Sequence, residues 1–230
     1  MAKAVVAVVR NGVVDPVVLR GDVEVGVLDL DSADTPDPDG VVLRVEGQGD
    51  KEELYFPFVS EALEEAQDIL LHEEPPERMD LVGLEDEEEG EKTLWAFPLW
   101  EKGRGGSAVV FLVERGVAEP YVLGKGAVQV TVLDLDADLE EPHHVVLALN
   151  DDRILDEDDL GELLPPELVP EWGTFSTVED AVEAVREILA RAPEGEILRL
   201  DLEGRDDEGD TLWIRVVWED EEDLEVSGPL

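Results

Sequence analysis

The acidic motif Leu-Asp-Leu-Asp occurs twice in the chain, at residues 28–31 and 133–136. Aspartates two positions apart on a strand share one face and lie about 7 Å apart along it. Such a pair can bind a divalent cation, or its oxygens can accept hydrogen bonds from turn amides, a common role of aspartate. Because the motif recurs, we favour a shared structural role, with a metal site as the alternative, for Asp29, Asp31, Asp134 and Asp136.

A second acidic segment, residues 35–40, has oxygen-bearing side chains at the alternate positions of a calcium-binding loop. Thr35, Asp37 and Asp39 are followed by Gly40, which would permit the sharp turn that such a loop needs. The first position is threonine, prolines interrupt the loop, and no helical pattern flanks it. We therefore disfavour a calcium site and predict no metal-binding residues.

Motifs of known catalytic chemistry do not occur in the sequence. His72, His143 and His144 are the histidines, and the chain contains no glycine-rich phosphate loop, no Gly-x-Ser-x-Gly and no His-Glu-x-x-His. Carboxylates are so abundant that a catalytic pair cannot be separated from surface charge. The sequence therefore predicts no catalytic residues and no cofactor. A carboxylate- or metal-dependent enzyme stays an alternative.

The charge of the chain restricts its partners. The 230 residues include 61 acidic and 17 basic side chains, for a formal net charge of −44. Phosphates of nucleic acid or of an anionic membrane would be repelled, so direct binding to either is excluded and basic protein surfaces are the expected partners. Adaptation to high salt, without a charge-specific partner, explains the composition equally well.

Dense acidic runs are the candidate partner-binding residues. Rows of carboxylates spaced like DNA phosphates could also mimic nucleic acid in the cleft of a DNA-binding protein. The candidates fall in three segments: Glu85, Asp86, Glu87, Glu88 and Glu89; Asp156, Glu157, Asp158 and Asp159; and Asp206, Asp207 and Glu208.

An internal repeat organises the chain. Residues 4–19 align without a gap with 108–123, and residues 23–31 (VEVGVLDLD) align with 128–136 (VQVTVLDLD). A match of this length predicts two tandem copies of one domain. We expect domains at residues 1–102 and 107–230, with a linker at 103–106, an insertion near 150–172 and an acidic tail.

Hydrophobic patterning predicts the elements of each copy. Asn11-Gly12, and Arg115-Gly116 in the second copy, separate apolar runs as in a tight hairpin, and Pro16 and Pro120 favour either an edge strand or a bulge. Helical spacing predicts helices at 60–72, capped by Ser60, and at 177–191, with a capping box from Ser176. Two strands close each copy, at 79–84 and 93–100 and at 197–202 and 211–218. The prediction is an α+β fold: each copy is an antiparallel sheet with one packed helix.

The leading hairpin and its following strand resemble those of small uncharacterised phage and mobile-element proteins. The resemblance rests on the valine run before Asn11-Gly12-Val13-Val14, on residues 22–25 and on the first Leu-Asp-Leu-Asp. It implies no activity. With no signal-like N-terminus and no segment long enough to span a bilayer, a cytoplasmic location is expected. The absence of cysteine leaves the redox compartment undetermined, and the oligomeric state stays open.

Overall fold

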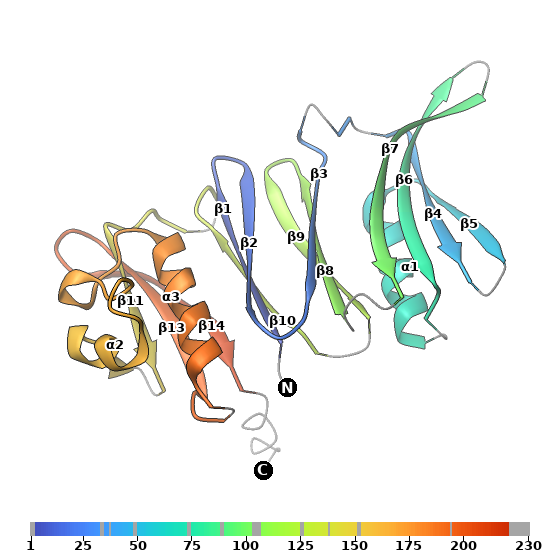
Figure 1. Cartoon of the computed structure of the whole chain (residues 1–230). Helices are drawn as coiled ribbons and strands as arrows, with labels where there is room; N and C mark the ends of the chain where they lie inside the picture. The colour runs from blue at the N-terminus through green and yellow to red at the C-terminus, as the bar shows by residue number, and fades with distance from the viewer. Residues whose placement is uncertain are drawn as a thin grey trace, which may run out of the picture. The chain divides into compact units, whose positions relative to one another are not determined.

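The computed structural model (Figure 1) describes residues 3–32, 35–36, 38–47, 50–72, 75–87, 90–102, 107–124, 127–137, 139–150, 153–193 and 195–220. The chain folds into two compact units. Unit 1 combines Met1–Gly21 with Ala127–Leu230, and unit 2 is the continuous segment Asp22–Gly126.

The described residues of unit 2 form a three-stranded sheet, a four-stranded sheet and one helix. The strand order is β3-β8-β9 in the first sheet and β5-β4-β6-β7 in the second. The elements are β3 (Glu24–Asp29), β4 (Gly40–Glu46), β5 (Lys51–Phe56), α1 (Val59–His72), β6 (Arg78–Glu87), β7 (Gly90–Glu101), β8 (Ser107–Glu114) and β9 (Val117–Gly124).

Unit 1 repeats this plan, with sheets ordered β10-β1-β2 and β12-β11-β13-β14. A short helix and a 3-10 turn lie between β12 and the main helix of this unit. The elements are β1 (Ala4–Arg10), β2 (Val13–Arg20), β10 (Gln129–Asp134), β11 (His144–Leu149), β12 (Arg153–Ile154), α2 (Glu157–Leu163), η1 (Glu171–Gly173), α3 (Val178–Arg191), β13 (Arg199–Arg205) and β14 (Thr211–Glu219).

The α+β character agrees with the prediction, but a single antiparallel sheet in each copy is wrong. Each unit has two sheets, and the three-stranded one is mixed, because β1 pairs in parallel with β10 and β3 pairs in parallel with β8. The physical reason lies in β1 and β8, whose apolar residues do not alternate with polar ones and are buried almost throughout. Such strands take central positions with neighbours on both edges. The proline-containing strands β2 and β9 lie at the edges, as predicted.

The compact units do not coincide with the sequence repeats. The N-terminal hairpin β1–β2 pairs with β10 from the second half of the chain, and the hairpin β8–β9 pairs with β3 from the first half (Figure 1). The predicted boundaries at 102 and 107 therefore cut through unit 2, and the predicted linker 103–106 lies outside the described residues. We call these two hairpins exchanged, because each pairs with a strand from the other half of the chain. The pairing is possible because β3 and β10 have similar sequences, so the edge of either strand can pair with either hairpin.

One long helix in each unit packs on both sheets: α3 contacts β2 and β11, and α1 contacts β9 and β4. The cap of α3 is Thr177, whose hydroxyl accepts from Asp180 N at 3.1 Å, rather than the predicted Ser176. Helix α1 begins at Val59, so Ser60 lies inside its first turn and is not the cap. None of the helices in the described part of the chain has the length and apolar character required to cross a bilayer.

Both four-stranded sheets contain the same tryptophan–glycine contact. The Trp95 ring lies over Gly83 of the neighbouring strand, and the Trp213 ring lies over Gly204. A Cβ at either glycine would approach the ring to 2.3 Å. Each indole N–H donates to a loop carbonyl, at 3.0 Å for Trp95 to Pro36 and 2.8 Å for Trp213 to Glu140. These tryptophans therefore fix the loop before β4 or β11, as packing residues do.

Candidate partner-binding surfaces

The second aspartate of each Leu-Asp-Leu-Asp motif caps the turn of an exchanged hairpin. Asp31 accepts from the amides of Arg115 and Gly116 at 2.8 and 2.6 Å, and Asp136 accepts from Asn11 and Gly12 at 2.8 and 2.7 Å. All four turn residues have positive φ, between 53° and 76°, which is the geometry of a type I′ turn. The predicted role as acceptors of turn amides is confirmed for these two residues.

The first aspartate of each motif bonds locally. Asp29 accepts from Asp31 N at 2.9 Å, and Asp134 accepts from the amides of Asp136 and Ala137. At Asp136, hydrogen bonds from the Gly12 and Asn11 amides, with Arg10 nearby, hold the pKa of the carboxyl below its ordinary value. Within the described ranges no group of three or more His, Asp or Glu side chains is arranged for a metal ion. Asp37 of the calcium-like segment lies outside those ranges.

Two of the predicted acidic runs occupy equivalent turns, and the third belongs to the insertion. The first run lies at the end of β6, which Asp86 and Glu87 complete. Glu85 pairs with Lys92 of β7 at 2.9 Å. Glu88 and Glu89 are outside the described residues. Residues 206–208 form the β13–β14 turn. There Asp206 accepts from the amides of Glu208 and Asp210, while the Asp207 and Glu208 side chains are exposed.

The run at 156–159 starts helix α2. Asp156 and Asp159 form a capping box, and Asp159 also pairs with Arg153. Glu157 and Asp158 are exposed in the first turn, where the positive end of the helix dipole favours carboxylates. Asp156, Asp159 and Asp206 therefore have local structural roles.

Basic side chains in the described part of the chain are largely engaged by its own carboxylates. Arg10 contacts Glu141 and Glu179 at 3.2 and 3.0 Å, and the equivalent pairs Arg78–Asp80 and Arg199–Asp201 recur in the two units at 2.6 and 2.9 Å. Further ion pairs involve Arg44, Lys51, Lys92, Arg115, Arg153, Arg186, Arg191 and Arg205. Since few cations are available to offset the remaining carboxylates, the surface presented to a partner is negative.

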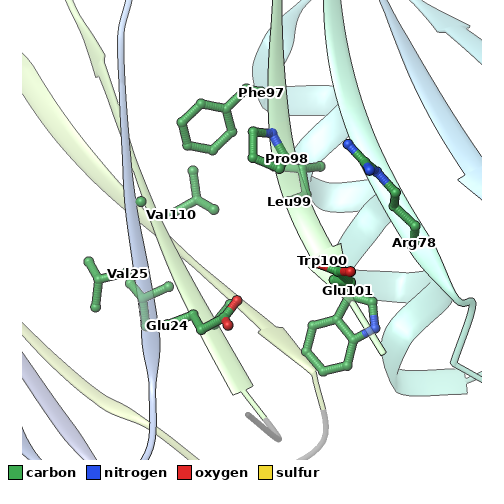
Figure 2. Close-up of a pocket in the computed structure, with 12 residues that line it drawn as sticks. Glu24, Val25, Arg78, Phe97, Pro98, Leu99, Trp100, Glu101 and Val110 are labelled. Atoms are coloured by element: carbon green, nitrogen blue, oxygen red, sulfur yellow. The ribbon is translucent and has the colours of Figure 1, made fainter. Parts of the chain in front are cut away.

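Unit 2 has a pocket of about 560 Å³ between β7 and the strands β3 and β8. Figure 2 shows the Phe97 ring and the Glu24 carboxylate extending toward the space between these strands. Phe97 packs against Gly26, where a Cβ would lie 2.7 Å from its ring. The nearby Trp100 is buried, and its indole N–H has no hydrogen-bond partner among the residues described.

The equivalent strands of unit 1 are tied together by side chains. Gln129 and Thr131 of β10 occupy the positions of Glu24 and Gly26. Gln129 Oε1 accepts from Glu219 N, and Thr131 Oγ1 donates to Val216 O, both at 3.0 Å. Gln129 and Thr131 therefore connect the strands in unit 1, whereas a pocket lies beside Glu24 and Gly26 in unit 2.

A second groove, of about 510 Å³, lies in the insertion of unit 1. Its walls come from the segment before α3 and from the first two turns of that helix, and they include the exposed Trp172. None of the residues that line this groove belongs to the acidic runs predicted from the sequence. Its one sequence signal is a tryptophan without a counterpart in the first half of the chain.

The chain matches no protein-family model, no curated protein and no solved structure. Function therefore has to be argued from the surfaces themselves.

Proposed function

We propose that the protein is a non-enzymatic, acidic interaction protein that docks on basic surfaces of other proteins. The observation that carries the proposal is that most lysine and arginine side chains are paired with carboxylates of the same chain. The 17 basic residues face 61 acidic ones, and most basic side chains in the described ranges are already held in internal ion pairs. A basic partner therefore meets carboxylates with little competition from the protein's own lysines and arginines. Charge complementarity of this kind accelerates association and selects partners.

The proposal includes a repeated scaffold. We infer that the two units descend from one duplicated domain, because they share their strand order, the tryptophan–glycine contact and the aspartate caps on the exchanged hairpins. Duplication gives each unit an acidic turn between the last two strands of its four-stranded sheet, β6 and β7 in unit 2 and β13 and β14 in unit 1. Mimicry of nucleic acid is the special form of the proposal, in which these turns engage the cleft of a DNA-binding protein.

The test compares the folded chain with a charge-matched polymer. Nona-arginine and a basic DNA-binding protein are titrated into the full chain and into polyglutamate of similar net charge, over a range of ionic strength. Docking on the folded surface predicts stoichiometric binding that persists at salt concentrations where polyglutamate no longer binds. Displacement of the bound protein by duplex DNA supports mimicry.

The competing explanation is salt adaptation. It predicts that the chain binds no better than polyglutamate and that its stability rises steeply with molar potassium chloride. That pair of results would overturn the proposal.

A further inference from the structure

Trp172 is the most exposed large apolar side chain in the described part of the chain. Its exposed fraction is 84%, whereas Trp213 and Trp218 of the same unit are 7% and 1% exposed. An indole buries a large area when a partner covers it, and tryptophan is among the residues enriched at the energetic centres of protein interfaces.

The fold holds Trp172 in a conformation that tryptophan rarely adopts. Its φ and ψ are 62° and 17°, in the left-handed region. Gly173 packs against the backbone of Asp156 at the start of α2, where a Cβ would lie 3.1 Å from the nearest atoms. Two residues further, Phe175 exchanges backbone hydrogen bonds of 2.8 and 2.9 Å with Val145 of β11. The backbone that follows the indole is therefore held in place by contacts with α2 and β11.

The groove beside Trp172 combines apolar walls with carboxylates. Leu168, Val169, Pro170 and Phe175 supply apolar surface, and four acidic side chains line it: Glu167, Glu171, Asp180 and Glu183. Glu167, Glu171 and Asp180 are exposed, while Glu183 pairs with Arg186. The side chain that suits an apolar groove rimmed by carboxylates is long and apolar along its stem and positively charged at its head. Arginine and lysine have this form.

Unit 1 already contains such a contact elsewhere. The guanidinium carbon of Arg20 lies 5.2 Å from the centre of the Trp218 ring, within the range of a cation–π interaction. At Trp172 the chain has the aromatic face and the carboxylates, while Arg10 and Arg186 are held in ion pairs with Glu179 and Glu183.

We infer that the Trp172 groove is the docking site for an arginine or lysine side chain of a basic partner. The cation stacks on the indole, its stem lies along the apolar wall, and Glu167, Glu171 and Asp180 face its charge. The inference rests on the proposed function and specifies where a partner is anchored. Arginine is the preferred occupant, because its planar guanidinium stacks on an aromatic ring and hydrogen-bonds carboxylates at its edge.

The test uses the full chain, with nona-arginine as the probe. Two readouts are followed: the dissociation constant at physiological salt, and the indole N–H resonance that disappears in Trp172→Phe and is thereby assigned to Trp172. We expect this resonance to shift on binding while the other indoles stay unchanged. Trp172→Ala should weaken binding about tenfold, Trp172→Phe should weaken it less, and nona-lysine should bind more weakly than nona-arginine.

Matched controls separate the groove from the general charge. Tyr55→Ala removes an exposed aromatic ring from unit 2 and should leave the dissociation constant unchanged. Glu167→Gln with Glu171→Gln should weaken binding more than Glu52→Gln with Glu65→Gln, which removes the same charge from exposed positions of unit 2.

The outcomes distinguish the two proposals. If Trp172→Ala leaves the dissociation constant unchanged, and the Trp172 indole resonance of the wild-type chain does not shift on binding, the groove is not the docking site. The proposed acidic docking function would then still stand. Failure of the wild-type chain to bind better than polyglutamate would overturn both. Thermal unfolding of each variant shows that it is folded.

Discussion

The two units share one plan but differ where their two sheets meet. In unit 1, Gln129 and Thr131 join β10 to β14; in unit 2, Glu24 and Gly26 replace them and a pocket opens beside Phe97. Unit 1 also has the insertion that presents Trp172. The common features, namely the exchanged hairpins, their aspartate caps and the tryptophan–glycine contacts, maintain the fold. The differences lie at the junction of the two sheets and in the insertion.

The largest expected effect comes from the exchanged hairpins. Residues 22–126 contain all the strands of unit 2, so this fragment should fold by itself, whereas residues 127–230 lack the buried strand β1 and should not. Added peptide 1–21 should restore folding of 127–230, because it supplies the apolar strand that covers β10 and α3. Dispersion of amide resonances in NMR spectra checks each fragment. A folded 127–230 fragment without the peptide would mean that the exchange is dispensable.

The next effect concerns the two glycines beneath the tryptophans. Gly83→Ala and Gly204→Ala place a methyl group 2.3 Å from an indole carbon, so either the ring or the strand must move. We expect each to destabilise its unit by about 3 kcal/mol in chemical denaturation. Gly161→Ala is the control, because nothing lies within 4 Å of its Cβ and alanine favours helix. Equal effects at Gly161 and Gly204 would show that the contact is unimportant.

A matched pair of tryptophans tests the difference between the units directly. Trp218 Nε1 donates to Ile197 O at 3.0 Å, and the guanidinium of Arg20 lies over the Trp218 ring. The indole N–H of Trp100 has no hydrogen-bond partner in the described part of unit 2. Trp218→Phe should therefore cost about 1–2 kcal/mol more than Trp100→Phe. Hydrogen exchange of each unit measures the two losses separately. A larger loss at Trp100 would contradict this assignment.

The aspartate caps predict a dependence on pH. Asp136→Asn should lower the melting temperature at neutral pH, because the turn amides of Asn11 and Gly12 lose a charged acceptor. The folded-state pKa of Asp136 is lowered, so its stabilisation is present above the unfolded pKa and is lost as pH falls through the folded value. The difference between wild type and variant should thus shrink in acid. Asp207→Asn, at an exposed turn, should show no such difference at any pH.

The smallest effect is a gain in stability. Trp172→Gly relieves a left-handed conformation and sacrifices little buried surface, so it should stabilise unit 1 by about 1 kcal/mol while abolishing the groove's aromatic face. Thermal unfolding measures the gain. A clear loss of stability would assign Trp172 a packing role instead.

Much of the local structure could be predicted from the sequence, because it depends on neighbouring residues. The Asn11-Gly12 turn, the main helices and the aspartate acceptors of turn amides were all predicted, since positive φ, helical spacing and short polar side chains act over a few residues. Helix starts differed by one residue, as at Thr177, because Ser176 and Thr177 can both cap. The acidic runs were visible, but their composition could not separate capping residues such as Asp156 from exposed ones.

Sequence alone determined the strong negative charge and predicted the main helices and most strands, although it did not predict β5 or β12. Tertiary structure decided which β-hairpin pairs with which strand. Because residues 23–31 and 128–136 are nearly identical, the local pattern is satisfied by either pairing, and only the packing of the whole chain distinguishes them. Tertiary structure likewise decided that Trp172 is exposed while four other tryptophans pack in the units, because burial depends on which surfaces meet and not on residue type.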